Sequence, residues 1–126
     1  MDVKLKLFIL PETLGICHLS KNSPIPEWAE DISFCSITRT KEELSIVCPQ
    51  DKIPTGVMAE KGWKAFKLEG DLSISSVGVI SALAKPLADA GISIFNVSTY
   101  ETNYILVEEK NLTEAKNVLG KLCEIK

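Results

Sequence analysis

Residues 87–107 read LADAGISIFNVSTYETNYILV, and this stretch decides the fold. The Ala90-Gly91 pair predicts a helix end, because glycine enters the left-handed conformation that closes a helix at little cost. Two apolar runs follow, residues 92–98 and 103–108, and the polar residues 99–102 between them predict the turn of a β-hairpin. A helix that leads into a hairpin is therefore expected in the second half of the chain.

The segment before this stretch predicts a strand and the body of the helix. Residues 63–68 are expected to form the strand, which ends at residues 69–71. The helix should begin at Ser75 or Ser76, whose hydroxyl can accept from the N–H groups of a first helical turn. Pro86 lies inside the helix and should bend it. Apolar residues recur along it at three- and four-residue spacing: Val77, Ile80, Leu83, Ala84, Leu87 and Ala88.

The segment after the hairpin predicts one more helix, which should open at Asn111 or Thr113. Its expected apolar face consists of Leu112, Ala115, Val118, Leu119 and Leu122. The order of this half is thus strand, helix, strand, strand, helix.

An internal repeat appears when the chain is laid over itself with a shift of sixty residues. Residues 32–38 then fall on 92–98, residues 44–47 on 104–107, and residues 3–5 on 63–65, without a gap. Three matches at one offset predict a duplication. We therefore expect two modules, at residues 1–60 and 61–126.

The first copy follows the same order in a degenerate form. A strand is expected at residues 3–10 and a hairpin from residues 32–37 and 44–47. The first helix slot, residues 11–31, contains Pro11, Gly15, Pro24 and Pro26, so only a short turn at residues 27–30 is expected there, anchored by Trp28. The second slot, residues 51–61, carries Pro54 and Gly56 and should also be short.

The predicted fold class is α+β, with two ferredoxin-like modules of the βαββαβ type packed side by side. A strand–helix–hairpin–helix unit needs a further strand to complete such a sheet, and the residues after Cys123 are too few for a long one. Strand exchange is an open solution, in which residues 63–68 or 3–10 serve as the edge strand of the other module.

Composition excludes several classes of function. The 126 residues are 45% hydrophobic and 25% charged, as in an ordinary globular protein. A net charge of −3 without a basic cluster argues against nucleic acid as a partner. The apolar run at residues 7–10 is too short for a secretory leader, and no stretch reaches the ~20 apolar residues that a membrane span requires. A soluble, cytoplasmic protein that does not engage membranes is expected.

Cysteine and histidine offer little catalytic chemistry. The four cysteines, Cys17, Cys35, Cys48 and Cys123, form no Cys-x-x-Cys pair and no zinc pattern, so reduced thiols are expected, with Cys35 and Cys48 as small apolar residues of strands. His18, the single histidine, should be a loop residue beside a half-buried Cys17, because neighbours in an extended segment point to opposite faces. No catalytic residue, metal site or cofactor is predicted.

The second half of the chain resembles the ACT domain. The resemblance rests on residues 65–70, 87–95 and 97–107, and its Ser-Thr-Tyr-x-Thr-x-Tyr turn is similar to that of small bacterial tandem-ACT proteins related to the animal cytosolic arginine sensors. Residues 54–63 resemble the linker between their two modules. The first half resembles the family only weakly.

The resemblance implies a site where ligands bind in this family. The first strand-to-helix loop would supply backbone N–H groups for a carboxylate, and the hairpin turn would contact the ligand's side chain. Carried over by position, the ligand-binding residues are Gly70, Ser73, Ser76, Val77 and Gly78 of the loop, and Thr99, Tyr100 and Asn103 of the turn. Each of them also has a purely structural interpretation as a turn, cap or packing residue.

The residues agree with this chemistry, with one departure from the family. Glycine lets a backbone approach a ligand closely, and a helix N-terminus favours an anion such as a carboxylate. The arginine sensors place acidic residues against the ligand's cationic end, whereas this sequence carries the neutral Ser73 and Asn103. A neutral amino acid is therefore the expected ligand, although Asp71 and Glu101 lie near in the sequence.

Two functions are compatible with these features. The first is a non-enzymatic regulatory protein that binds an amino acid, and the alternative is an interaction module without a ligand. Because modules of ~60 residues bury little surface, a homodimer is expected in either case.

Overall fold

The chain folds into two compact units, each of which is described by itself. The computed structural model describes residues 5–30, 33–69 and 76–126. The insert unit consists of residues 12–63, and the terminal unit consists of residues 1–11 and 64–126. The unit boundary therefore falls three residues beyond the expected one, and the first eleven residues belong with the second half of the chain.

The insert unit is a small antiparallel sheet with two single-turn helices. Its strands are β2 (Leu14–Leu19), β3 (Ser36–Arg39), β4 (Leu44–Pro49) and the first half of β5 (Met58–Glu69), in the order β3-β4-β2-β5. The 3₁₀ turns η1 (Glu27–Ala29) and η2 (Gln50–Lys52) occupy the two helix positions. Strand, turn, hairpin, turn and strand reproduce the ferredoxin-like order with both helices reduced.

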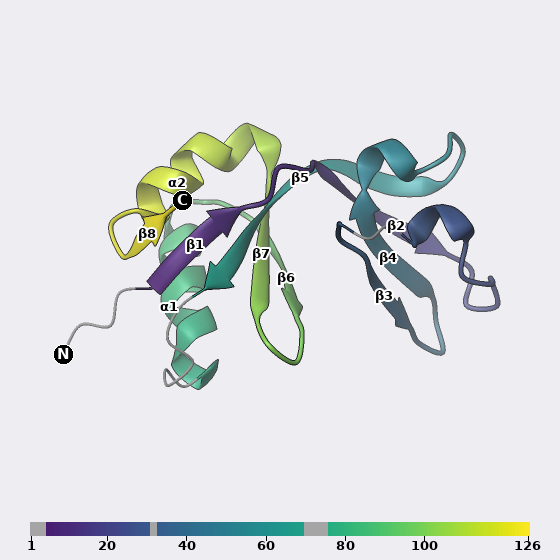
Figure 1. Ribbon diagram of the computed structural model, residues 1–126, viewed down its shortest axis with the longest axis horizontal. Helices are drawn as coiled ribbons and strands as arrows, with labels where there is room; N and C mark the ends of the chain where they lie inside the picture. Colours follow the sequence, from purple (N-terminus) through teal and green to yellow (C-terminus); the bar gives the residue numbers. More distant parts are fainter. Residues whose placement is uncertain (1–4, 31–32, 70–75) are drawn as a thin grey trace. The chain divides into compact units, whose positions relative to one another are not determined.

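The terminal unit is also ferredoxin-like, and it has α-helices where the insert unit has single 3₁₀ turns (Figure 1). Its elements are β1 (Leu5–Ile9), the second half of β5, α1 (Ser76–Asp89), β6 (Ile94–Ser98), β7 (Asn103–Glu108), η3 (Glu109–Asn111), α2 (Leu112–Leu119) and β8 (Cys123–Ile125). The sheet order is β6-β7-β5-β1-β8. The fold is thus α+β, with ferredoxin-like sheets and few helices.

Strand β1 confirms one of the two exchanges that the sequence left open. It pairs antiparallel with β5, with Leu7 opposite Leu68, in the place that the last strand of a ferredoxin-like sheet normally takes. The short β8 pairs in parallel with the outer side of β1. The N-terminal strand therefore completes the sheet of the other half of the chain.

The helix slot expected at residues 11–31 is wrong in its first half, which forms β2 instead. Cys17 is buried and His18 is exposed, as the alternation of a strand requires. Gly15 lies within this strand, and its lack of a side chain makes room for Ile53, because an added Cβ would lie 2.5 Å from Cδ1 of Ile53. The short turn expected near Trp28 is confirmed as η1.

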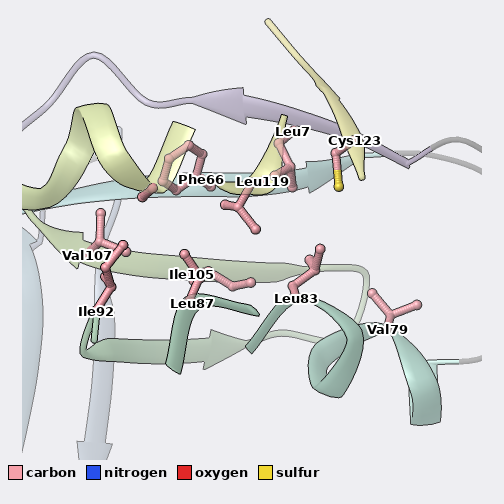
Figure 2. Packing of buried hydrophobic residues seen from close by; sticks show 11 residues of the cluster. Leu7, Phe66, Val79, Leu83, Leu87, Ile92, Ile105, Val107, Leu119 and Cys123 are labelled. Atoms are coloured by element: carbon pink, nitrogen blue, oxygen red, sulfur yellow. The ribbon is translucent and has the colours of Figure 1, made fainter. Parts of the chain in front are cut away.

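The core of the terminal unit lies between the sheet and its two helices (Figure 2). Val79, Leu83 and Leu87 of α1 face Ile105 and Val107 of β7. The other buried members are Leu7, Phe66, Ile92, Ala115, Leu119 and Cys123. Because α1, α2 and the sheet share one apolar cluster, both helices cover the same face of the sheet.

The end of α1 shows why residues 87–107 are decisive. Gly91 has φ 77°, and its N–H bonds to the carbonyl of Ala88 at 2.9 Å. The N–H of Ile92 bonds to the carbonyl of Leu87 at 2.9 Å, and both side chains are buried in the core. This is a Schellman closure with its apolar contact. Pro86 is accommodated within the helix.

The end of α2 differs from the expected pattern. The helix closes at Leu119, so Leu122 falls outside it and is exposed instead of joining the apolar face. The chain then forms the three-residue strand β8, which buries Cys123.

Candidate functional site

Three segments lie toward the same end of the terminal unit. The second half of β5 ends there, α1 begins there, and the turn between β6 and β7 lies at the same end (Figure 1). The hydroxyl of Thr102 in the turn donates to the carbonyl of Leu68 near the end of β5. This bond ties the hairpin turn to the strand that leads into the predicted ligand loop.

The hairpin turn is closed by its own hydrogen bonds. The N–H of Thr99 donates to the carbonyl of Thr102 at 2.8 Å, and the N–H of Thr102 donates to Oγ1 of Thr99 at 3.1 Å. Tyr100, at the tip, is fully exposed. The turn therefore holds its backbone shape while it presents an aromatic side chain to solvent.

A chain of polar side chains leads from β6 into the turn. Nδ2 of Asn96 donates to Oγ of Ser98 at 2.9 Å, and that hydroxyl donates to Oδ1 of Asn103 at 2.6 Å. Ser98 and Asn103 are cross-strand partners, and Asn96 lies opposite Ile105. Because Ile105 belongs to the core beneath the helices, this polar chain lies on the face of the sheet that the helices cover.

The first turn of α1 begins on this same side. Gly78 is exposed, and a Cβ added there would meet no atom within 4 Å. The first N–H groups of a helix have no partner within the helix, and the dipole of a 14-residue helix favours an anion at this end. A carboxylate could therefore approach the backbone here.

The predicted site residues that the structure describes lie in two segments. Ser76, Val77 and Gly78 form the start of α1, and Thr99, Tyr100 and Asn103 lie in or beside the turn. Gly70 and Ser73 lie outside the described residues. The sequence interpretation missed Thr102 and Ser98. The Thr99-x-x-Thr102 spacing signals a side-chain-closed turn and could have identified the first.

The single cysteine–histidine neighbour pair is not a nucleophile and its base. Burial raises the pKa of the Cys17 thiol, partly offset by a hydrogen bond with Cys48 and by the charge of Lys61. His18 lies on the opposite face of β2, in the strand rather than in a loop, with Nε2 3.9 Å from Oε1 of Glu43. The described residues also contain no group of three metal-binding side chains.

All four cysteines are thiols, and the expectation for Cys48 as a buried apolar residue is confirmed. Cys35 differs, because it is exposed and precedes β3 rather than lying within a strand. As for membranes, none of the helices within the described ranges is both long and apolar enough to cross a bilayer.

Two family models match the chain. A model described as an ACT domain matches residues 58–121, and a second, described as an N-terminal domain, matches residues 12–56. The human protein CASTOR3P is 33% identical over 100 residues, which cover 69% of this chain and 61% of that protein. The rat cytosolic arginine sensor for mTORC1 subunit 1 is 26% identical over 102 residues, covering 73% of this chain and 31% of the sensor. The chain thus spans less than two thirds of either relative.

Solved structures extend the similarity over the whole chain. The crystal structure of protein Atu0741 from Agobacterium tumefaciens has a TM-score of 0.90 at 36% identity, and the match covers 100% of this chain and 93% of that protein. The ligand-free regulatory subunit of aspartate kinase from Thermus thermophilus has a TM-score of 0.62 at 11% identity, covering 92% of this chain and 97% of that subunit. The second likeness concerns the fold alone.

Proposed function

This chain belongs to the ACT domain family, and from that premise we propose that it is a non-enzymatic regulatory protein that binds a free amino acid in the cytoplasm. ACT domains are commonly regulatory, and the rat relative is by its name an arginine sensor. The proposal requires no cofactor and no membrane. It includes assembly as a homodimer, which is tested separately below.

One observation carries the proposal. The hydrogen bond from Thr102 to the carbonyl of Leu68 holds the β6–β7 turn against the end of β5. The turn and the end of β5 are therefore fixed relative to each other, so a ligand that contacts the turn meets a surface that is already formed. Such preorganisation lowers the entropic cost of binding.

The proposed binding mode follows from the groups at this end. The ligand's carboxylate is held by backbone N–H groups at residues 76–78, where a helix N-terminus favours an anion. Its side chain extends toward Thr99, Tyr100 and Asn103. Gly70 and Ser73 of the preceding loop complete the proposed set.

The neutral turn makes a neutral amino acid the proposed ligand. A guanidinium group gains most from charge-assisted bonds to carboxylates, and the turn position here is Asn103. The arginine of the rat relative's name is therefore not carried over to this chain.

A thermal-shift screen of the twenty amino acids tests the proposal. A ligand at 100 times its dissociation constant adds about 2.7 kcal/mol of stability, which for this size corresponds to a melting shift on the order of 3–8 °C. Gly78→Asp should abolish the shift, because its carboxylate would repel that of the ligand. Ala82→Asp, which places the same charge on an exposed position one turn further along α1, should retain most of it.

Two results would contradict the proposal. If no amino acid shifts the melting temperature, the chain is better explained as an interaction module without a ligand. If the shift persists unchanged in Gly78→Asp, the ligand binds elsewhere.

A further inference from the structure

Two of the four cysteines lie at matching positions of the β3–β4 hairpin. The last pair at the open end of this hairpin joins Ser36 to Val47. Cys35 directly precedes Ser36 and Cys48 directly follows Val47, so the next step of the same register sets the two cysteines opposite each other. Directly opposed residues of antiparallel strands have Cα atoms about 4.5–5.5 Å apart, and a disulfide needs about 4.4–6.8 Å. The backbone at this end of the hairpin therefore suits a bridge between Cys35 and Cys48.

The two thiols differ in their access to solvent. Cys35 is exposed, whereas Cys48 is buried in the core cluster of the insert unit. Ile37, two residues after Cys35, packs against the same cluster. An exposed thiol is the one that a dissolved oxidant reaches, and a second thiol beside it can convert the oxidised sulfur into a disulfide.

The insert unit stands to gain from a crosslink at this edge. Strand β3 has four residues and, among the described strands, pairs only with β4. Both helix positions of the unit hold single 3₁₀ turns. A bridge between residues 35 and 48 restricts the unfolded chain and so favours the folded unit. Oxidation should therefore stabilise the insert unit.

We propose that Cys35 and Cys48 form a peroxide-responsive thiol pair, in which Cys35 is oxidised first and Cys48 closes the disulfide. The Cys35 thiolate attacks one oxygen of the peroxide, the O–O bond breaks, and a sulfenic acid forms while the leaving hydroxide takes up a proton as water. The Cys48 sulfur then gives up its proton and attacks the sulfenic sulfur, so that the S–O bond breaks and a second water leaves. The two sulfurs lose the two electrons that the peroxide gains, and a thiol reductant restores both thiols.

Cys17 is the competing partner for Cys48. Its thiol shares a hydrogen bond with that of Cys48. The register, however, sets Cys17 opposite Ile46 and Cys48 opposite Gly15, which makes the two cysteines diagonal neighbours. Diagonal residues lie about 7–8 Å apart, and cysteines whose Cα atoms are more than about 7 Å apart are bridged only if the backbone moves. Both thiols are also buried, so an oxidant reaches neither of them directly.

Peptide mapping of the full chain tests the pair. The reduced protein is treated at low concentration with hydrogen peroxide, its remaining thiols are blocked, and it is digested with trypsin, which places each of the four cysteines in its own peptide. The expected product is a link between the peptides of Cys35 and Cys48, lighter than the two peptides by two hydrogen atoms and reversed by dithiothreitol.

Fluorescence supplies a second readout, because both tryptophans belong to the insert unit. The melting temperature that they report should rise by several degrees on oxidation. It should return to its first value when dithiothreitol is added. An oxidised protein that carries the link but melts unchanged would contradict the stabilising role.

Matched variants assign the order of the two steps. Cys35→Ser should leave the other three thiols reduced at the same peroxide dose, since the thiol that meets the oxidant is gone. Cys48→Ala should stop the reaction at the sulfenic acid of Cys35, which dimedone labels. Cys17→Ala and Cys123→Ala each remove a buried thiol outside the pair, and both should keep the link.

Three results would overturn the proposal. The first is a link between Cys17 and Cys48 in place of the expected one. The second is a bridge between the Cys35 residues of two chains, seen as a dimer on a non-reducing gel. The third is conversion of Cys35 to a sulfinic acid while Cys48 stays reduced. None of these measurements involves amino-acid binding, so their outcome is independent of the function proposed above.

Discussion

Buried thiols give the molecule a pH dependence that originates in single residues. Burial raises the pKa of Cys123, and burial is also the largest influence on Cys17, whose pKa is raised as well. A thiol with a raised pKa in the folded state stays protonated there after its unfolded counterpart has ionised. Unfolding then releases protons, so the stability these thiols contribute below their unfolded pKa is lost as the pH rises above it.

We therefore expect the free energy of unfolding to fall as the pH rises through about 8.5, the ordinary thiol pKa, and beyond. Urea unfolding followed at a series of pH values measures this slope. The variant Cys123→Ala should be less stable at neutral pH but should show a shallower decline. An equal slope in both proteins would mean that other groups govern the alkaline transition.

Single residues also show how far sequence reasoning reaches. The opposite faces of Cys17 and His18 follow from strand alternation alone. The exposure of Cys35 does not, because it depends on where β3 begins, and that boundary is set by pairing with β4. The hydrogen bonds of Ser98 and Thr102 likewise need the register of the hairpin and the position of β5, which no local pattern in the sequence contains.

At the scale of elements, β5 changes register within its length. Leu14 pairs with Trp63 while Ile16 pairs with Glu60, so β5 carries one extra residue between these pairs. Gly62 lies in this bulge with φ 85°, and its N–H donates to Oε1 of Gln50 at 2.8 Å. A glycine is suited to this position because residues with a Cβ are strained at positive φ.

The variant Gly62→Ala should lower the free energy of unfolding by about 1–2 kcal/mol, the cost of a left-handed residue with a Cβ. The cost is purely conformational, since an added Cβ at Gly62 would meet no atom within 4 Å. Gly78→Ala is the matched control, because Gly78 is equally open but helical, and alanine there should be neutral or stabilising. Chemical denaturation of both variants measures the difference, and equal effects would argue against the bulge.

Strand β1 offers a second test at this scale. Leu7 is fully buried in the terminal unit, although it lies far from the rest of that core in the sequence. Leu7→Ala should therefore cost about 2–5 kcal/mol. Phe8→Ala, at the next position but with a side chain that is 40% exposed, should cost clearly less. If denaturation shows the two variants to be equally mild, β1 does not belong to the terminal core.

Helices and strands were predicted correctly where apolar residues recur regularly over a long segment, and they were missed where the apolar run is short. The helix α1, the hairpin β6–β7 and the start of α2 follow from apolar spacing and from Gly91. Strand β2 was missed because Pro11 and Gly15 suggested broken helix, while its pattern Leu14-Gly15-Ile16-Cys17 is too short to distinguish from a loop. Its identity is fixed by pairing with β4 and β5, which is tertiary information.

For the whole molecule, the repeated strand pattern was visible in the sequence, but the strand with which each repeat pairs was not. The shift of sixty residues places β1 on the second half of β5, as equivalent first strands of two modules. In the structure these two strands instead pair with each other, and β2 takes the first-strand position beside β4. An exchange of this kind preserves every strand pattern in the sequence, so patterns alone could not choose between the alternatives.

The proposed homodimer would form through an edge strand of a sheet, where backbone groups are free to pair with a second copy. Among the described strands, β6 pairs only with β7, and its five residues, Ile94–Ser98, carry no charge. The edge strand β3 ends in Arg39, and β8 contains Glu124. Natural edge strands are usually protected by charge, so β6 is the edge best suited to pair with a second copy.

A dimer makes two measurements depend on protein concentration. Light scattering should show a mass that falls toward that of one chain on dilution, and the melting temperature should fall with it, because dissociation removes a stabilising partner. Asn96→Lys introduces a charge at an exposed position of β6 and should shift the equilibrium to the monomer, whereas Thr38→Lys at an exposed position of β3 should not. A single-chain mass at every concentration would remove the dimer, and equal effects of the two lysines would place the interface on another edge.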